Sequence, residues 1–146
     1  MVIELNLDRS IPEIEADDVR LRQLLHNLVK NSLETLEGEG QISLKTEAIE
    51  KSGRSWVEFT VEDSGHGIAP EVEHNLFDPY VTTKTSGSGL GLAIVQKIVD
   101  EHGGSVRVGK SRKGGARFSV RLPVSSAANE SKTSPEVEPL KTRVMR

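Results

Sequence analysis

The sequence of 146 residues has no cysteine, few aromatic residues and no long apolar run. Without cysteine it forms neither disulfide bonds nor thiolate metal sites, and a reducing compartment is allowed. Aromatic residues make up 3% of the chain, so a core has to be built from aliphatic side chains. No apolar run approaches the ~20 residues that a transmembrane helix needs. The formal net charge of −3 gives no overall attraction to nucleic acids or anionic membranes.

The composition indicates one folded domain followed by a polar tail. With 35% apolar residues, a chain of this length can bury one core. The end of the chain is rich in serine, glutamate, lysine, proline and threonine and has little apolar content, which is typical of disorder. We therefore expect a domain over residues 1–123, ended by Pro123, and a disordered tail over residues 124–146.

Apolar periodicity predicts a mixture of strands and helices. Alternation predicts strands at residues 2–7, 14–16, 41–49, 56–62, 105–108 and 115–122. A helix is expected from about Val19 to Leu36, capped by Asp17 or Asp18. Its apolar stripe consists of Leu21, Leu24, Leu25, Leu28, Val29, Leu33 and Leu36. A short helical turn is expected over residues 71–76.

The glycine-rich stretch Gly87-Ser88-Gly89-Leu90-Gly91 leads into a second predicted helix. That helix ends at the pair Gly103-Gly104, and its stripe consists of Leu92, Ile94, Val95, Ile98 and Val99. Glycine lets the backbone approach an anion, and a helix start offers free N–H groups and partial positive charge. The pattern fits a phosphate-binding loop. It equally fits a flexible loop before an ordinary helix, because short glycine patterns occur by chance.

Two asparagines, Asn27 and Asn31, share one face of the first helix. Asparagine is a poor residue for the middle of a helix, so the pair is unusual. An amide oxygen can ligate Mg²⁺, and an amide N–H₂ group can donate to phosphate. The alternative is two half-buried asparagines at a helix edge.

The strand over residues 56–62 runs into Asp63-Ser64-Gly65-His66-Gly67. A carboxylate at a strand end can accept a hydrogen bond from an exocyclic amine, and the glycines let a ligand meet the backbone. The alternative is an Asp-initiated turn.

The segment over residues 77–86 has few helix signals, and a loop of this length is typically a lid or a binding loop. We expect Phe77 and Tyr80 to anchor it. Lys84 either reaches a phosphate as a point charge or is simply solvated.

Four segments in a fixed order resemble the N, G1, F and G2 boxes of the catalytic ATP-binding domain of bacterial sensor histidine kinases. They are Leu24–Ser32, Asp63–Ile68, Leu76–Lys84 and Gly87–Val95. The third, with its Phe-x-Pro-Tyr-x-Thr-Thr-Lys form, resembles the nitrogen-regulation sensor kinases in particular. The resemblance covers about residues 1–123 and implies an α/β fold, the Bergerat sandwich: a mixed, mostly antiparallel sheet packed on one face by about three helices, with a mobile ATP lid.

The resemblance also implies roles for single residues. Asn31 would ligate Mg²⁺ and Asn27 would lie at the phosphates, which makes these two the catalytic pair. Asp63 would accept the adenine amine, beside backbone at Gly65 and Gly67. The implied nucleotide-binding set is Asn27, Asn31, Asp63, Gly65, Gly67, Ile68, Phe77, Thr83, Lys84, Gly87, Ser88, Gly89, Leu90 and Gly91. Gly114-Gly115 resembles a late glycine pair of the family, but Ala116 follows where a threonine is frequent, so one hydroxyl near the base is missing.

The implied function is that of a histidine kinase using ATP and Mg²⁺. The γ-phosphate would go to a histidine on a dimerisation domain and then to a response regulator. The chain's four histidines lack the His-Glu-x-x-x-Pro-like context of such an acceptor; they are His26, His66, His74 and His102. We therefore expect an excised catalytic part with little turnover alone.

Other functions and settings follow from the same resemblance. Related ATPases, gyrase and the ninety-kilodalton heat-shock chaperone, have a glutamate base where this chain has Asn27, and an amide cannot accept a proton from water, which favours a kinase over a hydrolase. A serine kinase of the anti-sigma-factor type and a nucleotide-sensing module without transfer remain as alternatives. We expect this chain by itself to be a cytoplasmic monomer that contacts neither nucleic acid nor membrane. We expect its parent protein to be a dimer, and the sequence leaves open whether that protein is anchored in the inner membrane.

Overall fold

The computed structural model describes residues 1–80, 90–125 and 143–145. In chain order its elements are β1 (Val2–Leu7), β2 (Ile14–Ala16), α1 (Asp18–Leu36), β3 (Gln41–Lys51), β4 (Arg54–Asp63), the 3₁₀ turn η1 (Glu73–Asn75), α2 (Gly91–Glu101), β5 (Ser105–Lys110), β6 (Ala116–Pro123) and β7 (Arg143–Met145). The described part of the chain contains two α-helices and one 3₁₀ turn, where we expected about three helices. Pro70 and Pro79 bound the segment around η1, and so short a stretch cannot offset the cost of helix nucleation.

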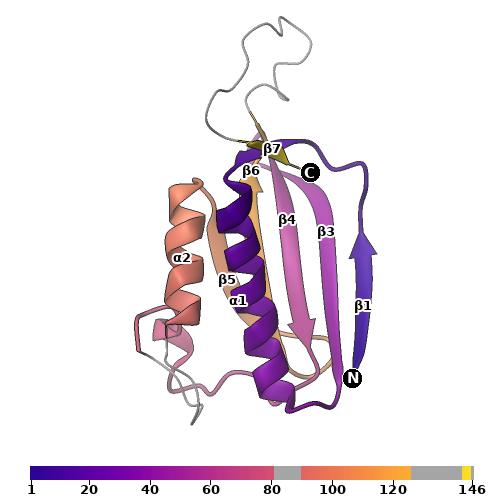
Figure 1. The fold of residues 1–146 in the computed structure, drawn as a ribbon, viewed down its shortest axis with the longest axis vertical. Helices are drawn as coiled ribbons and strands as arrows, with labels where there is room; N and C mark the ends of the chain where they lie inside the picture. The colour runs from indigo at the N-terminus through magenta and orange to yellow at the C-terminus, as the bar shows by residue number, and fades with distance from the viewer. Residues whose placement is uncertain (81–89, 126–142, 146) are drawn as a thin grey trace, which may run out of the picture.

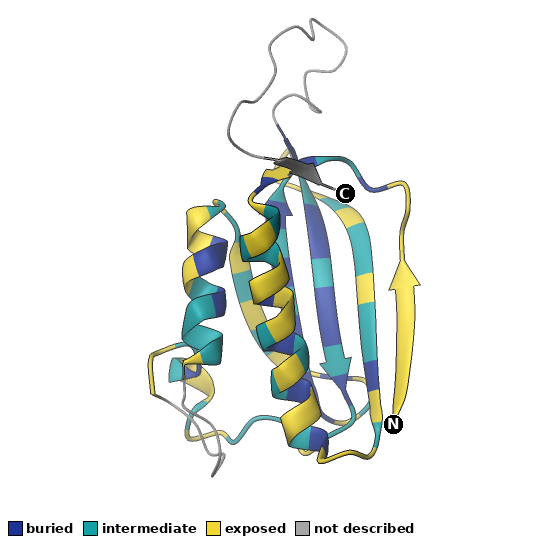
Figure 2. Ribbon diagram, in the orientation of Figure 1, coloured by how far each residue is buried: buried dark blue, intermediate teal, exposed yellow. Residues whose placement is uncertain are grey.

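Five strands form one sheet in the order β1-β3-β4-β6-β5, and both helices lie on the same face of it (Figure 1). Strand β1 pairs with β3 in parallel, whereas β3–β4, β4–β6 and β5–β6 are antiparallel. The mixed, mostly antiparallel sheet predicted from the sequence is confirmed, and so are its two hairpins. Strand β1 lies at one edge and is exposed along its whole length, as Figure 2 shows.

The core lies between the helices and the sheet and is mainly aliphatic. Its largest fully buried apolar side chains are Leu28, Ile42, Val61, Val95, Ile98, Val99, Phe118 and Val120. The apolar stripe predicted for the first helix was too wide, because Leu25 and Leu33 are 37% and 40% exposed. Ser32 is fully buried instead. The spacing of apolar residues along a helix shows which face is buried, but it does not show how wide a part of that face the sheet covers.

Strand alternation divides the sheet into an apolar and a polar face. Along β6, the residues Ala116, Phe118, Val120 and Leu122 are buried under the helices, while the alternate residues are half-exposed on the other side. No helix of the described residues covers that second face (Figure 1). The polar face over β5 and β6 is therefore accessible to a ligand.

The start of α1 and the end of α2 are tied together. Asp17 caps α1 by accepting from the N–H groups of Val19 and Arg20, which decides between the two predicted caps. The Asp17 N–H donates to His102 Nε2 at 3.2 Å, so the ring proton is on Nδ1, which lies 2.7 Å from the Ile98 carbonyl. Helix α2 then stops at the predicted glycine pair.

The end of the described chain differs from the expected tail. Val124 and Ser125 are buried, and Ser125 N–H donates to the Glu13 carbonyl at 3.0 Å. Strand β7 pairs antiparallel with β2. Residues 126–142 and 146 lie outside the described part, so the division of the chain at residue 123 stays a prediction. Neither α-helix among the described residues has the length and hydropathy of a transmembrane span.

Candidate functional site

The predicted site residues gather at one end of the helix-covered face. Strand β4 ends there at Asp63, helix α2 begins there at Gly91, and the C-terminal half of α1 packs between them (Figure 1). Three of the four segments singled out in the sequence therefore lie close together, with the segment on α1 between the other two. The N-terminal half of the glycine-rich stretch lies outside the described residues.

Asp63 is held rigidly by three hydrogen bonds from three parts of the chain. Its side chain is 1% exposed. Its Oδ1 accepts from Gly65 N–H at 2.9 Å and from Ala116 N–H at 3.1 Å. Its Oδ2 accepts from Ser32 Oγ at 3.2 Å. A carboxylate has about four acceptor positions, so one on Oδ2 is left for a ligand N–H.

Close backbone packing around Asp63 depends on glycine. A Cβ at Gly115 would overlap Asp63 Oδ1 and lie 2.6 Å from Gly65 N. A Cβ at Gly65 would lie 2.6 Å from Thr35 Cγ2. Gly115 N–H also donates to the Asp63 carbonyl at 3.1 Å. These glycines let β4, β6 and α1 approach one carboxylate from three sides.

Asn27 lies on α1 beside the start of α2, and Asn31 lies one turn further along α1. Asn27 Nδ2 is buried and has no hydrogen-bond partner among the described residues. Its Oδ1 is 3.8 Å from where a Cβ of Gly91 would lie. Leaving a buried N–H unpaired costs about 1–3 kcal/mol, so Asn27 is set to donate to an acceptor. Asn31 is half-buried one turn further along, where Thr35 Oγ1 donates to its carbonyl at 3.0 Å.

The segment before the glycine-rich stretch is anchored by one aromatic residue, not two. Phe77 packs edge-to-face on Phe118, with ring centroids 6.2 Å apart at 86°. Tyr80 is 76% exposed and has a positive φ of 67°. The predicted anchoring role of Tyr80 is therefore wrong, since the backbone at that position turns its ring outward to solvent.

The remaining predicted residues divide into described and undescribed ones. Ile68 is partly buried against the core, and Gly67 has a φ of 81°, a conformation that favours glycine. Leu90 is the N-cap of α2 and makes no side-chain cap. Five predicted residues lie outside the described residues: Thr83, Lys84, Gly87, Ser88 and Gly89.

Sequence reasoning gave two site residues no role. Ser32 stood inside the first motif, and its burial beside a carboxylate depends on β4, which is distant in sequence. Gly115 was noted only as part of a glycine pair, yet it controls how closely β6 approaches Asp63. The described residues contain no group of three or more His, Cys, Asp or Glu side chains placed to hold a metal ion.

Comparisons with known proteins agree with this geometry. The family described as histidine kinase-, DNA gyrase B- and HSP90-like ATPases matches residues 16–126. Sensor histidine kinase ZraS of Salmonella typhimurium is 41% identical over 122 residues, which is 84% of this chain and 26% of that protein. The chain thus spans about a quarter of the length of this curated relative.

Solved structures show the same arrangement of elements. The catalytic domain of histidine kinase ThkA superposes with a TM-score of 0.73 at 33% identity, covering 85% of this chain and 81% of that one. Full-length ShkA in complex with AMPPNP gives a TM-score of 0.66 at 37% identity, covering 83% of this chain and 25% of that one.

Proposed function

The chain belongs to the histidine kinase-, DNA gyrase B- and HSP90-like ATPase family, and on that premise we propose that it binds Mg²⁺-ATP for transfer of the γ-phosphate to a histidine. The observation that carries the proposal is Asp63, a buried carboxylate oriented by three donors with an acceptor position left over. The relative ShkA was solved with AMPPNP, an ATP analogue, which supports the same ligand class for this chain.

The adenine end of the ligand would lie at Asp63. An exocyclic amine donates to the open position on Oδ2, and the base packs along the backbone of Gly65 and Gly67. In guanine a carbonyl oxygen replaces the exocyclic amine at this place. Two acceptors would then face each other without a donor, so the site favours adenine. Ala116 contributes its N–H to orient the carboxylate, although it lacks the frequent hydroxyl.

The phosphate end would lie between α1 and the start of α2. The unpaired Asn27 Nδ2 suits a phosphate oxygen, and the first turn of α2, which has no side-chain cap, adds the N–H group of Gly91. Ser32, which contacts Asp63, is about 7.5 Å along the helix axis from Asn27, a span that a nucleotide bridges. Thr83, Lys84, Gly87, Ser88 and Gly89 complete this end in the proposal.

The residues present fit a magnesium ion. The amide oxygen of Asn31 is a hard oxygen ligand of the kind that Mg²⁺ takes, together with phosphate oxygens and water. When bound, the ion would neutralise charge on the phosphates. Asn27 and Asn31 then position the phosphates, and neither amide can act as a base toward water. This chemistry favours transfer to a protein acceptor over hydrolysis.

The acceptor histidine would lie on a dimerisation domain that is not part of these 146 residues, and a response regulator would receive the phosphate. We place the domain boundary at residue 123, and we expect this chain alone to be a cytoplasmic monomer. The nitrogen-regulation subtype belongs to the proposal as well. A serine on a partner protein is the competing acceptor.

Calorimetry with AMPPNP tests the nucleotide site, with and without Mg²⁺, on the wild-type chain and on Asn31→Ala. Asn6→Ala on the exposed strand β1 is the matched control. We expect Mg²⁺-dependent binding that Asn31→Ala weakens about tenfold or more, as for loss of one metal ligand, and that Asn6→Ala leaves unchanged. Equal binding by all three proteins would remove Asn31 from the site.

Transfer is tested separately, by adding a histidine-containing dimerisation domain and labelled ATP. Label that is lost in acid but kept in base identifies phosphohistidine. Acid-stable label on a serine would support the competing acceptor. No label despite normal AMPPNP binding would make the chain a nucleotide-binding module without transfer.

A further inference from the structure

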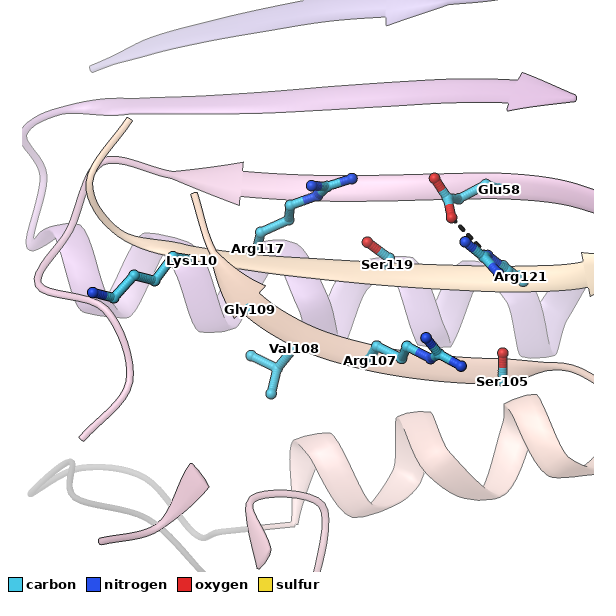
Figure 3. Close-up of a pocket in the computed structure, with 9 residues that line it drawn as sticks. All are labelled: Glu58, Ser105, Arg107, Val108, Gly109, Lys110, Arg117, Ser119 and Arg121. Carbon is cyan, nitrogen blue, oxygen red and sulfur yellow. Dashed lines mark hydrogen bonds and ion pairs between the residues drawn. The ribbon is translucent and has the colours of Figure 1, made fainter. Parts of the chain in front are cut away.

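A hollow of about 280 Å³ lies on the face of the sheet opposite the helices. The residues that line it come from strands β4, β5 and β6, as Figure 3 shows. Four cationic side chains line it, and only one carboxylate does; the cations are Arg107, Lys110, Arg117 and Arg121. In a chain with a net charge of −3, this is a local excess of positive charge.

The strand register explains why three arginines meet there. Arg107 on β5 is directly opposite Ser119 on β6. Arg117 and Arg121 lie two residues to either side of Ser119 on β6. They are therefore diagonal neighbours of Arg107, with Cα atoms about 7–8 Å from its Cα. The three guanidinium groups thus surround one serine hydroxyl (Figure 3). Like charges at this spacing repel one another unless an anion lies among them.

The carboxylates nearby neutralise this cluster only in part. Glu58 satisfies Arg121, with Nε and Oε2 2.8 Å apart. Glu62 is 3.8 Å from Arg117 Nε, and this nitrogen is buried without a hydrogen-bond partner among the described residues. Oε2 of Glu62 already accepts from Ser111 Oγ and from a backbone N–H.

The other two cations have no ion-pair partner within the described ranges. Arg107 and Lys110 are exposed at the outer strand of the sheet. Gly109, directly opposite Arg117, has no side chain, and a Cβ there would meet no atom within 4 Å. The space beside Arg117 is therefore open to a ligand.

We propose that this hollow binds a phosphate-bearing small molecule, at a site separate from the nucleotide site on the helix-covered face. Guanidinium groups donate in pairs to phosphate oxygens, and Ser119 adds a hydroxyl between them. The bound anion accepts from guanidinium N–H groups of Arg107 and Arg117 and offsets the repulsion among the arginines. A hollow near the lower end of the ligand-pocket range fits a compact anion better than an extended acidic chain.

The test is a ¹⁵N NMR titration of the full chain with sodium pyrophosphate, against sodium chloride at matched ionic strength. AMPPNP and Mg²⁺ are present at saturation, so that the nucleotide site is occupied. We expect saturable shifts at the amides of Gly109, Arg117 and Ser119. Arg107→Gln and Arg117→Gln should each weaken binding at least tenfold.

Lys45→Gln is the matched control, because Lys45 lies on the same face of the sheet and already pairs with Glu47 at 2.9 Å. It should change the affinity less than twofold. Gly109→Glu should abolish binding, since its carboxylate fills the open space beside Arg117. Normal spectra of each variant without ligand show that the fold is intact.

Four outcomes would overturn the proposal. They are an absence of shifts, equal shifts with chloride, shifts confined to Asp63, Gly65 and Gly91, and binding of a polyglutamate peptide without any response to pyrophosphate. The third would mean that pyrophosphate competes at the nucleotide site. The last would make the arginine face a docking surface for an acidic partner protein. The three outcomes other than the third leave nucleotide binding untested, and calorimetry with AMPPNP measures that binding separately.

Discussion

Adding one methyl group at Gly115 should damage both the fold and the nucleotide site. The new Cβ of Gly115→Ala would overlap Asp63 Oδ1 and lie 2.5 Å from the Asp63 carbonyl oxygen, so the carboxylate or strand β6 has to move. Either movement breaks the hydrogen bonds from Gly65 N–H and Ala116 N–H to Oδ1. A hydrogen bond to a charged group contributes about 1.5–3 kcal/mol, and partial relaxation recovers some of it. We therefore expect the free energy of unfolding to fall by about 2–4 kcal/mol.

Urea unfolding measures that loss, and calorimetry with AMPPNP measures the site. Affinity should fall at least tenfold, because the displaced carboxylate no longer meets the adenine amine. Gly109→Ala is the control, since its Cβ meets no atom within 4 Å and should change neither quantity. If the free energy of unfolding of Gly115→Ala lies within about 0.5 kcal/mol of that of the control, and both variants bind AMPPNP equally well, the packing argument for Asp63 is refuted.

Four further predictions concern single side chains. Asp63→Asn should weaken ATP binding about tenfold and reduce the preference over GTP, measured by calorimetry; unchanged selectivity would contradict base recognition by Asp63. Asn31→Ala should keep the free energy of unfolding in urea within about 1 kcal/mol of the wild-type value while abolishing the effect of Mg²⁺ on the affinity for AMPPNP. A full Mg²⁺ effect in this variant would disprove the metal role of Asn31. Ser32→Ala removes one donor to a buried carboxylate and should lower stability by about 1–3 kcal/mol in the same assay; no change would mean that water replaces the hydroxyl. The hydrogen bond from Arg20 lowers the pKa of Glu101, so this pair stabilises the fold above the usual glutamate pKa and ceases to do so as the pH falls through the lowered pKa. Glu101→Gln should therefore be less stable than wild type at pH 7 and equally stable at strongly acidic pH. A stability difference that persists in acid would contradict this prediction.

Much of the fold was predictable because its signals are local. Alternation located every strand of the five-stranded sheet to within a few residues, since one face of each strand packs on the core. The predicted cap at Asp17 and the glycine stop after α2 also depend only on neighbouring residues. Strand β7 had no such signal, because its partner β2 lies far away in sequence.

The motifs selected residues that the structure brings together, but they did not give the contacts between them. The motifs named Asp63 and Asn27, yet Ser32 and Ala116, which orient Asp63, lie 31 and 53 residues from it in sequence. Leu25 and Leu33 fit the helical period as well as Leu24 does, and only the position of α1 over the sheet leaves them exposed. The roles of the single site residues stay predictions.

Strand β1 has a practical consequence for work with this chain. It is the parallel edge strand of the sheet, and Ile3, Leu5 and Leu7 are between 50% and 63% exposed on it. An edge with unpaired backbone groups and apolar side chains is a template on which a second molecule can extend the sheet. Concentrated samples should therefore aggregate through β1 first. A lysine in place of Leu5 would raise solubility without touching either ligand site.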